Sequence, residues 1–214
     1  GKDRSELSDR ESAEKIGFVM QSPDSQTVCD KVSAELAFGL ESFGVKSGEI
    51  QSRVGEMAAF FGIESLYDRD ISTLSGGQKQ LVALCSVMAT DPDILLLDEP
   101  TAQLDPVAAR ELLGILDRLN KEMGVTIIIA EHDPEELFDS CDKILYLANG
   151  KTEFFGTPTL TAKYFVKNAL EGFLPETAKA FARLCDDLPL NVRQGRAKFE
   201  KLGVTDIPKQ AVTD

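Results

Sequence analysis

The spacing of the apolar residues changes near residue 90. Before that point they recur every three or four positions, as they do in amphipathic helices. This spacing predicts helices over 30–46, 49–61 and 78–89. Beyond it, continuous apolar runs of strand length alternate with helical patterns. These runs predict strands over 93–98 and 125–130, with a helix over 107–123 between them.

The segments at the two ends complete the predicted order of elements. A helix is expected over 8–14, because Ser8 and Glu11 have the spacing of a capping box, and a strand follows over 15–21. The sequence "ANGK" at 148–151 is typical of a hairpin turn. The other predicted elements are a helix over 134–140, strands over 143–147 and 152–155, and three amphipathic stretches after Pro158, broken at Gly172, Pro175 and Pro189.

Strands without polar alternation, interleaved with helices, are typical of a parallel sheet covered on both faces. The expected fold class is therefore α/β, with a helical insert and a small helical appendage. We expect four parts: a remainder of the N-terminal core, a helical subdomain, a second core segment and a C-terminal helical extension, at 1–29, 30–90, 91–157 and 158–214. A membrane-spanning helix needs about 20 apolar residues, and no run of that length is present.

Composition narrows the possible partners. The 214 residues carry a net charge of −13, which disfavours direct binding to nucleic acid or to an anionic lipid surface. The four cysteines form no C-x-x-C pair and the chain has one histidine, so a zinc site is not expected. Scattered thiols of this kind indicate a reducing compartment.

Polar residues follow two of the predicted strands. Asp98 and Glu99 end one, and Glu131, His132 and Asp133 end the next. Ligands bind beyond the carboxyl ends of the strands in open parallel sheets, so these side chains would face one crevice. Asp98 suits a Mg²⁺ hydration shell, Glu99 could polarise an attacking water, and His132 could bond a terminal phosphate oxygen. Each residue alone is a common surface residue, whereas the combination favours a site.

The stretch "LSGGQKQ" at 74–80 places a serine and two glycines ahead of a predicted helix. Amides at a helix N-terminus favour an anion such as a phosphate. An isolated Ser-Gly-Gly would be a plain N-cap followed by a glycine turn. The chain contains no G-x-x-x-x-G-K-[ST] loop, the usual phosphate cradle of nucleotide-binding proteins.

"LSGGQKQ", "ILLLDEPTAQLDP" and "IIIAEHD", in this order, resemble the ATP-binding-cassette (ABC) ATPases over about residues 1–157. The resemblance implies a P-loop NTPase fold, with ATP and Mg²⁺ as cofactors. It also assigns roles by position. Gln21 corresponds to the glutamine loop, near Mg²⁺ and water, and Ser75, Gly76, Gly77 and Gln78 correspond to the signature motif. Asp98 corresponds to the Walker B aspartate and Glu99 to the catalytic glutamate. Asp105 corresponds to the D-loop at a dimer interface, and His132 to the switch histidine.

A narrower resemblance concerns the subfamily. "QSPDSQ", "VSAELAFGLESFGV", "TAQLDP" and "LPLNVRQGRAKFEKLG" are similar to energy-coupling-factor (ECF) importers of vitamins and metal ions. That likeness implies a head-to-tail dimer with a second ABC ATPase, identical or paralogous. It implies a transmembrane coupling protein and a substrate-binding membrane subunit as further partners, and no nucleic acid. The expected location is peripheral, on the cytoplasmic face of a bacterial or archaeal cell membrane.

Two departures from the family pattern leave alternatives open. The strand, Walker A loop and helix that begin such ATPases are absent before Gly1, so we expect the native protein to contain them and these 214 residues alone to be inactive. Leu81 stands where many relatives carry a basic residue. The alternatives are a soluble ABC protein of translation or DNA metabolism, which the acidic charge disfavours, and a non-catalytic truncated interaction module.

Overall fold

The computed structural model of the chain describes residues 6–132 and 134–201. The chain divides into two compact units, Gly1–His132 and Asp133–Asp214, and each is described by itself. The division falls inside the segment 91–157 that the sequence predicts as one part, so the four-part organisation stays a prediction.

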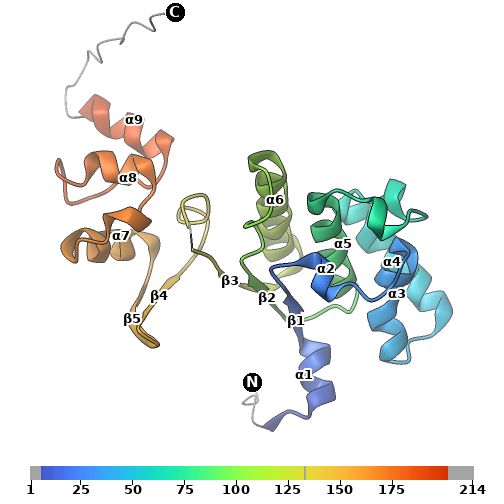
Figure 1. Cartoon of the computed structure of the whole chain (residues 1–214). Helices are drawn as coiled ribbons and strands as arrows, with labels where there is room; N and C mark the ends of the chain where they lie inside the picture. Colours follow the sequence, from blue (N-terminus) through green and yellow to red (C-terminus); the bar gives the residue numbers. More distant parts are fainter. Residues whose placement is uncertain (1–5, 133, 202–214) are drawn as a thin grey trace, which may run out of the picture. The chain divides into compact units, whose positions relative to one another are not determined.

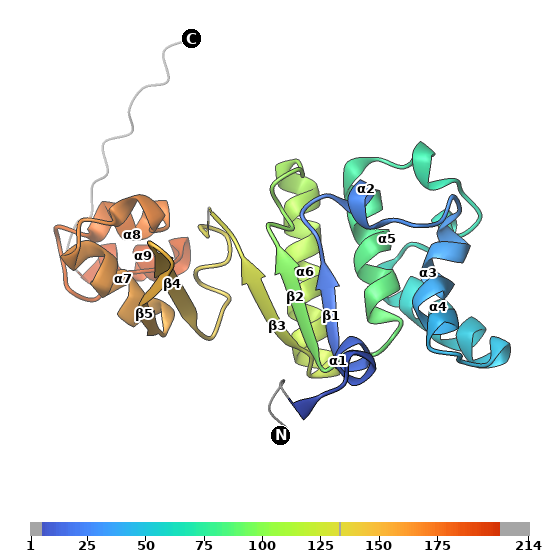
Figure 2. The ribbon, with the colours of Figure 1, turned by 60° about the horizontal axis from the view of Figure 1, so that its bottom comes forward.

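Within its described residues, the first unit has a parallel sheet of three strands in the order β1-β2-β3 (Figures 1 and 2). The strands are β1 (Ile16–Val19), β2 (Ile94–Asp98) and β3 (Thr126–Ala130). The register places Phe18 beside Leu96, and Leu96 beside Ile128. This arrangement confirms the predicted parallel sheet, and it brings the carboxyl ends of all three strands to one edge.

Two long helices belong to this sheet, α5 (Gly76–Met88) and α6 (Pro106–Met123), and the short α1 (Asp9–Lys15) precedes β1. Buried leucines of α6 share a core with the buried leucines of β2, and burial of each such side chain stabilises the fold by about 1.5–3 kcal/mol. These leucines are Leu95, Leu97, Leu112, Leu116 and Leu119. The absence of a side chain at Gly17 lets β1 approach α5, because a Cβ there would lie 2.4 Å from Cγ1 of Val87.

The opposite face of the sheet differs from the prediction. The sequence predicts helices on both faces, yet Phe18 and Ile128 are 46% and 55% exposed. Successive strand residues point to opposite faces, so these side chains lie on the face that α6 does not cover. Within the described part of the chain, the expectation of a sheet covered on both faces is therefore wrong.

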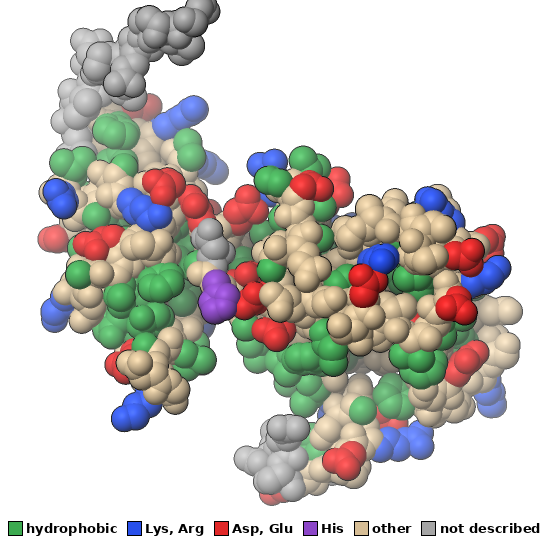
Figure 3. Space-filling view, in the orientation of Figure 1, with side chains coloured by type: hydrophobic (Ala, Val, Ile, Leu, Met, Phe, Trp, Pro, Cys, Tyr) green, Lys and Arg blue, Asp and Glu red, His purple; other side chains and the backbone are tan. Residues whose placement is uncertain are grey.

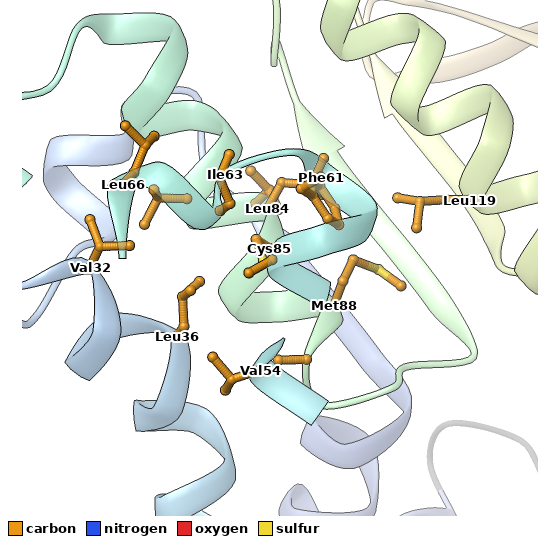
Figure 4. Close-up of a cluster of buried hydrophobic side chains, with 14 of the residues drawn as sticks. Val32, Leu36, Val54, Phe61, Ile63, Leu66, Leu84, Cys85, Met88 and Leu119 are labelled. Carbon is orange, nitrogen blue, oxygen red and sulfur yellow. The ribbon is translucent and has the colours of Figure 1, made fainter. Parts of the chain in front are cut away.

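The helical stretch between β1 and α5 confirms the predicted helices. It contains α2 (Pro23–Gln26), α3 (Val32–Ser42), α4 (Ser47–Phe61) and the single 3₁₀ turns η2 (Glu64–Leu66) and η3 (Ile71–Thr73). Figure 4 shows Leu36 of α3, Val54 of α4 and Leu84 of α5 pointing into a common core. Gly62 ends α4 in the left-handed conformation, with φ 68°, as a C-cap glycine does.

The second unit begins its regular structure with an antiparallel hairpin. Its strands are β4 (Ile144–Ala148) and β5 (Lys151–Gly156). Asn149 and Gly150 both have positive φ, 52° and 73°, as the predicted two-residue hairpin turn requires. The helices that follow are α7 (Pro158–Lys167), η4 (Glu171–Phe173), α8 (Glu176–Phe181) and α9 (Val192–Lys201). Phe138, Phe165 and Phe181 lie in a core of their own.

The helix predicted over 134–140 is wrong, because the structure forms successive turns there. Backbone hydrogen bonds from Leu137 to Pro134 and from Ser140 to Leu137 have the i+3 spacing of turns, and the i+4 bonds from Phe138 to Pro134 and from Cys141 to Leu137 are isolated from each other. The Ser140 hydroxyl donates to the Leu137 carbonyl at 3.1 Å, so a side chain competes for a helical acceptor. Phe138 in this segment is fully buried in the core of the second unit, and it anchors the turns there.

Candidate functional site

The predicted catalytic residues lie beyond the carboxyl ends of the three parallel strands. Gln21 follows β1 by two residues, Glu99 follows β2 directly, and His132 follows β3 by two residues. Because the strands are in parallel register, with Asp98 beside Ala130, these three loops emerge at one edge of the sheet.

The Glu99 carboxylate contacts the side chains of both Gln21 and His132. Nε2 of Gln21 donates to Oε2 of Glu99 at 2.7 Å, and Nε2 of His132 lies 2.7 Å from Oε1 of Glu99. The Glu99 side chain is only 23% exposed, whereas that of His132 is 90% exposed and stands at the surface (Figure 3). The structure therefore brings together three predicted site residues from three different loops, with both oxygens of the carboxylate in contact.

The backbone of Glu99 is unusual for a residue with a side chain. Its φ is 44°, in the left-handed region, which costs a non-glycine residue about 1 to 2 kcal/mol. The Glu99 N–H donates to the Ala130 carbonyl at 2.9 Å, so the chain still pairs with β3 as it turns. Such strain is typical of functional sites, where it aims a side chain that a relaxed backbone would direct elsewhere.

Asp98 is the residue that the sequence predicts as a ligand for Mg²⁺. It ends β2 and is exposed, one residue before Glu99. Among the described residues no three acidic, cysteine or histidine side chains are grouped as a ready-made metal site. Mg²⁺ needs no such group, because it commonly takes one or two carboxylates and completes its shell with water and substrate phosphates. The residues present fit that mode of binding.

Glu131 has a role that the sequence did not reveal. Its Oε1 accepts hydrogen bonds from the backbone N–H and the hydroxyl of Thr101, at 3.2 and 2.7 Å. It thus links the end of β3 to the loop after Glu99. Asp133, the third polar residue predicted at this strand end, lies outside the described residues.

The signature residues are organised within a single helix turn. Ser75 is the N-cap of α5, and its hydroxyl accepts from the Gln78 N–H while the Gln78 side chain accepts from the Ser75 N–H. Ser75 and Gly76 are exposed. In the described part of the chain, the N–H groups of Gly76 and Gly77 have no hydrogen-bond acceptor, so they and the helix dipole can meet an anion.

Gly77 also has a packing role. A Cβ at this position would lie 3.1 Å from Cβ of Ala108, so the glycine lets α5 approach the start of α6. Asp105 caps α6 there: its carboxylate accepts from the N–H groups of Val107 and Ala108, at 2.9 and 3.0 Å. These hydrogen bonds hold the pKa of Asp105 below its usual range.

Two further residues of α5 were missed by the sequence analysis. Nζ of Lys79 lies 2.6 Å from Oδ1 of Asp24 and so joins α5 to the loop after β1. Gln80 is buried, and it lines a hollow of about 210 Å³ together with Gln21 and other residues of these loops. Nothing in the local sequence marks either residue, because Asp24 and Gln21, to which they are related here, lie more than 50 positions away.

The fold and the strand-end cluster define a class that the comparisons with known proteins identify. The family model described as "ABC transporter" matches residues 1–102. The structure of cbiO1 from Clostridium perfringens, described as part of the ABC transporter complex cbiONQ, is 33% identical with a TM-score of 0.66, over 86% of this chain and 67% of that one. The chain therefore belongs to the ABC transporter ATP-binding family.

Particular relatives agree with that assignment. The chain is 42% identical over 190 residues to a Bacillus thuringiensis protein named as an ABC transporter ATP-binding protein, covering 88% of this chain and 34% of the relative. A Streptomyces coelicolor protein of the same description is 38% identical over 97% of this chain and 37% of its own length. The chain thus spans about a third of these relatives. A structure of the ATP-binding cassette MJ0796, dimeric and bound to ADP and Pi, is 28% identical with a TM-score of 0.60, over 72% of this chain and 68% of that one.

Proposed function

We propose that the chain is the ATP-hydrolysing part of an ABC transporter and that Glu99 is its catalytic residue. The observation that carries the proposal is the position of Glu99 between Gln21 and His132, at the carboxyl edge of the sheet. A carboxylate that other side chains orient can accept a proton from an attacking water as a general base. The strained backbone at Glu99 supports the same role.

The neighbouring residues take complementary roles. His132 would bond a terminal phosphate oxygen, and Asp98 would hold Mg²⁺ through its carboxylate or through water, with Gln21 nearby. When bound, Mg²⁺ would neutralise charge on the phosphate oxygens. Both carboxylate oxygens of Glu99 are engaged in this structure, so one contact must be released before Glu99 can accept a proton from water.

We further propose that Ser75 to Gln78 serve the nucleotide of a second subunit in a head-to-tail dimer. The exposed N-terminus of α5 is already ordered by its own capping box, and its glycine amides face no group of this chain in the described residues. Asp105 would lie at the same dimer interface. The likeness to a cassette whose structure is dimeric with ADP and Pi supports an assembly of this kind.

For the transported substrate class we propose ECF-type import of a vitamin or metal ion. The support is the likeness to cbiO1, which is described as part of cbiONQ, together with the subfamily sequence features. The partners would be a transmembrane coupling protein and a substrate-binding membrane subunit. The chain would then act peripherally, on the cytoplasmic face of the membrane. In the described residues, every helix is too short or too polar to span a membrane.

The test is the Glu99→Gln variant of the full-length gene product, because these 214 residues contain no G-x-x-x-x-G-K-[ST] loop. The amide keeps the shape of the side chain but is a poor base. We expect ATP binding and ATP-dependent dimerisation to persist while kcat falls by a factor of about 10² to 10⁴. A kcat within threefold of the wild-type value would exclude Glu99 as the catalytic base.

A further inference from the structure

Gln80 stands apart from the other buried side chains of α5, most of which are apolar. Only 2% of the residue is exposed, and within the described chain its Nε2 has no hydrogen-bond acceptor. An amide donor buried without a partner is destabilising, and an apolar side chain of the same shape would avoid that cost. Stability of the observed state therefore does not explain why a glutamine, and not an apolar residue, occupies position 80.

The hollow that Gln80 lines is also lined by a residue with an available hydrogen-bond acceptor. Gln21 lines it from the loop after β1, while Gln80 lines it from α5. Nε2 of Gln21 donates to Glu99, but no hydrogen bond from the described residues reaches Oε1 of Gln21. Gln80, with its unpartnered donor, and Gln21, with its available acceptor, thus both line one space of about 210 Å³.

The two segments are also joined next to these residues. Lys79, adjacent to Gln80, pairs with Asp24, three residues after Gln21. Gln26 holds the base of the loop: it accepts from the Met20 N–H at 2.9 Å and donates to the Phe18 carbonyl at 3.1 Å. Gln21 itself is exposed, so its side chain can turn while the loop stays in place.

We infer that Gln80 is a positioning residue that draws Gln21 away from Glu99. In the second state, Nε2 of Gln80 donates to Oε1 of Gln21, and Oε2 of Glu99 becomes available to the attacking water. Because Gln80 and the signature residues lie on the same helix, docking of the α5 N-terminus on a nucleotide would be linked to release of the carboxylate. This inference rests on the proposed ATPase function and adds a step to it.

The test is Gln80→Met in the full-length gene product, which removes the donor and keeps the length of the side chain. We expect kcat to fall about tenfold with KM unchanged, because loss of one hydrogen bond of about 1.4 kcal/mol changes an equilibrium tenfold. The melting temperature should stay equal or rise, since a buried unsatisfied donor is gone. Ser86→Ala, on the same helix and outside the hollow, is the matched control and should leave both quantities unchanged.

A double variant separates positioning from a general loss of structure. In a Gln21→Ala background, Gln80→Met should cause no further loss of kcat, because the acceptor is already absent. Additive losses, or a kcat of Gln80→Met within twofold of wild type, would overturn the inference. If Glu99→Gln abolishes turnover while Gln80→Met does not change it, the proposed function stands and this step alone fails.

A spectroscopic measurement keeps the inference testable should Gln80→Met fail to fold. In the Glu99→Gln protein with trapped ATP, the side-chain amide of Gln80 should shift in ¹⁵N-edited NMR spectra as its hydrogen bond forms. The shift should be lost on Gln21→Ala. An identical Gln80 signal with and without ATP would contradict the predicted second state.

Discussion

The strand-end cluster and the start of α5 differ in how their polar groups are satisfied. Glu99, Gln21 and His132 come from three loops, and Gln21 and His132 each contact the Glu99 carboxylate across the sheet edge. Ser75 and Gln78 satisfy each other within one helix turn. The cluster thus depends on the assembled sheet, whereas the helix start needs little beyond its own sequence. On the proposed function, the cluster supplies the catalytic carboxylate within its own subunit, and the helix start is presented to the nucleotide of another.

The largest expected effect is on the ATPase rate. It is seen when one subunit of a dimer carries a mutation in the strand-end cluster and the other carries a mutation at the start of α5. Neither Glu99→Gln nor Ser75→Arg homodimers should hydrolyse ATP at an appreciable rate. In a head-to-tail dimer of the two variants, one site combines the intact Glu99 of one subunit with the intact Ser75 of the other. Random mixing should therefore restore about a quarter of the wild-type rate, since half of the dimers are mixed and each has one of two sites intact.

The mixing experiment decides which subunit Ser75 serves. Steady-state ATPase assays measure the rate, and two affinity tags confirm that mixed dimers have formed. Mixed dimers without activity would show that both regions serve the nucleotide of the same subunit. The start of α5 would then not be presented to a partner.

His132→Ala gives the next largest effect, and it affects the strand-end cluster alone. The side chain is 90% exposed, so its removal leaves no cavity and the melting temperature should not change. Loss of a hydrogen bond to a charged group should lower kcat on the order of tenfold to hundredfold. Turnover and thermal unfolding are measured on the same sample. A change in stability without a change in kcat would make His132 a structural residue.

Substituting each of the two signature glycines should have a smaller effect, on the free energy of unfolding, and the two variants can be compared directly. Gly77→Ala places a methyl group 3.1 Å from Cβ of Ala108, and such crowding typically costs about 1–3 kcal/mol of unfolding free energy. Gly76→Ala meets only the Gln103 carbonyl at 4.0 Å and should be neutral. Urea denaturation of the two variants measures the difference. Equal stabilities would show that the contact between α5 and α6 adjusts freely.

The sequence predicted those parts of the site whose interactions are local or follow from strand order, and it did not predict contacts between distant positions. The apolar runs before Asp98 and Glu131 predicted parallel strands, and parallel strands place Glu99 near His132. Gln21 was assigned only through the family resemblance, because nothing local marks it. Lys79 could not be predicted, since its partner lies 55 positions away. The capping box of Ser75 spans three residues, and the Ser-Gly-Gly pattern indicates its N-cap as one of two alternatives.

The smallest expected effect is on stability at acid pH. It tests whether the start of α6 depends on a local cap, as the start of α5 does. The N–H groups of Val107 and Ala108 lower the pKa of Asp105 in the folded chain. Below the usual carboxyl pKa, near 3.9, the unfolded chain therefore takes up the Asp105 proton more readily. The stabilisation is fully present above that pH and is lost as the pH falls through the lower pKa of the folded state.

Asp105→Asn isolates this contribution, because asparagine caps a helix well but does not titrate in this range. Between about pH 4 and pH 2.5, the stability of the variant should fall less steeply than that of the wild type, as measured by denaturation followed by circular dichroism. Parallel slopes would mean that the Asp105 carboxylate adds nothing as a charge. The α6 start would then depend, as the α5 start does at Ser75, on a neutral cap that any hydrogen-bond acceptor of similar shape can supply.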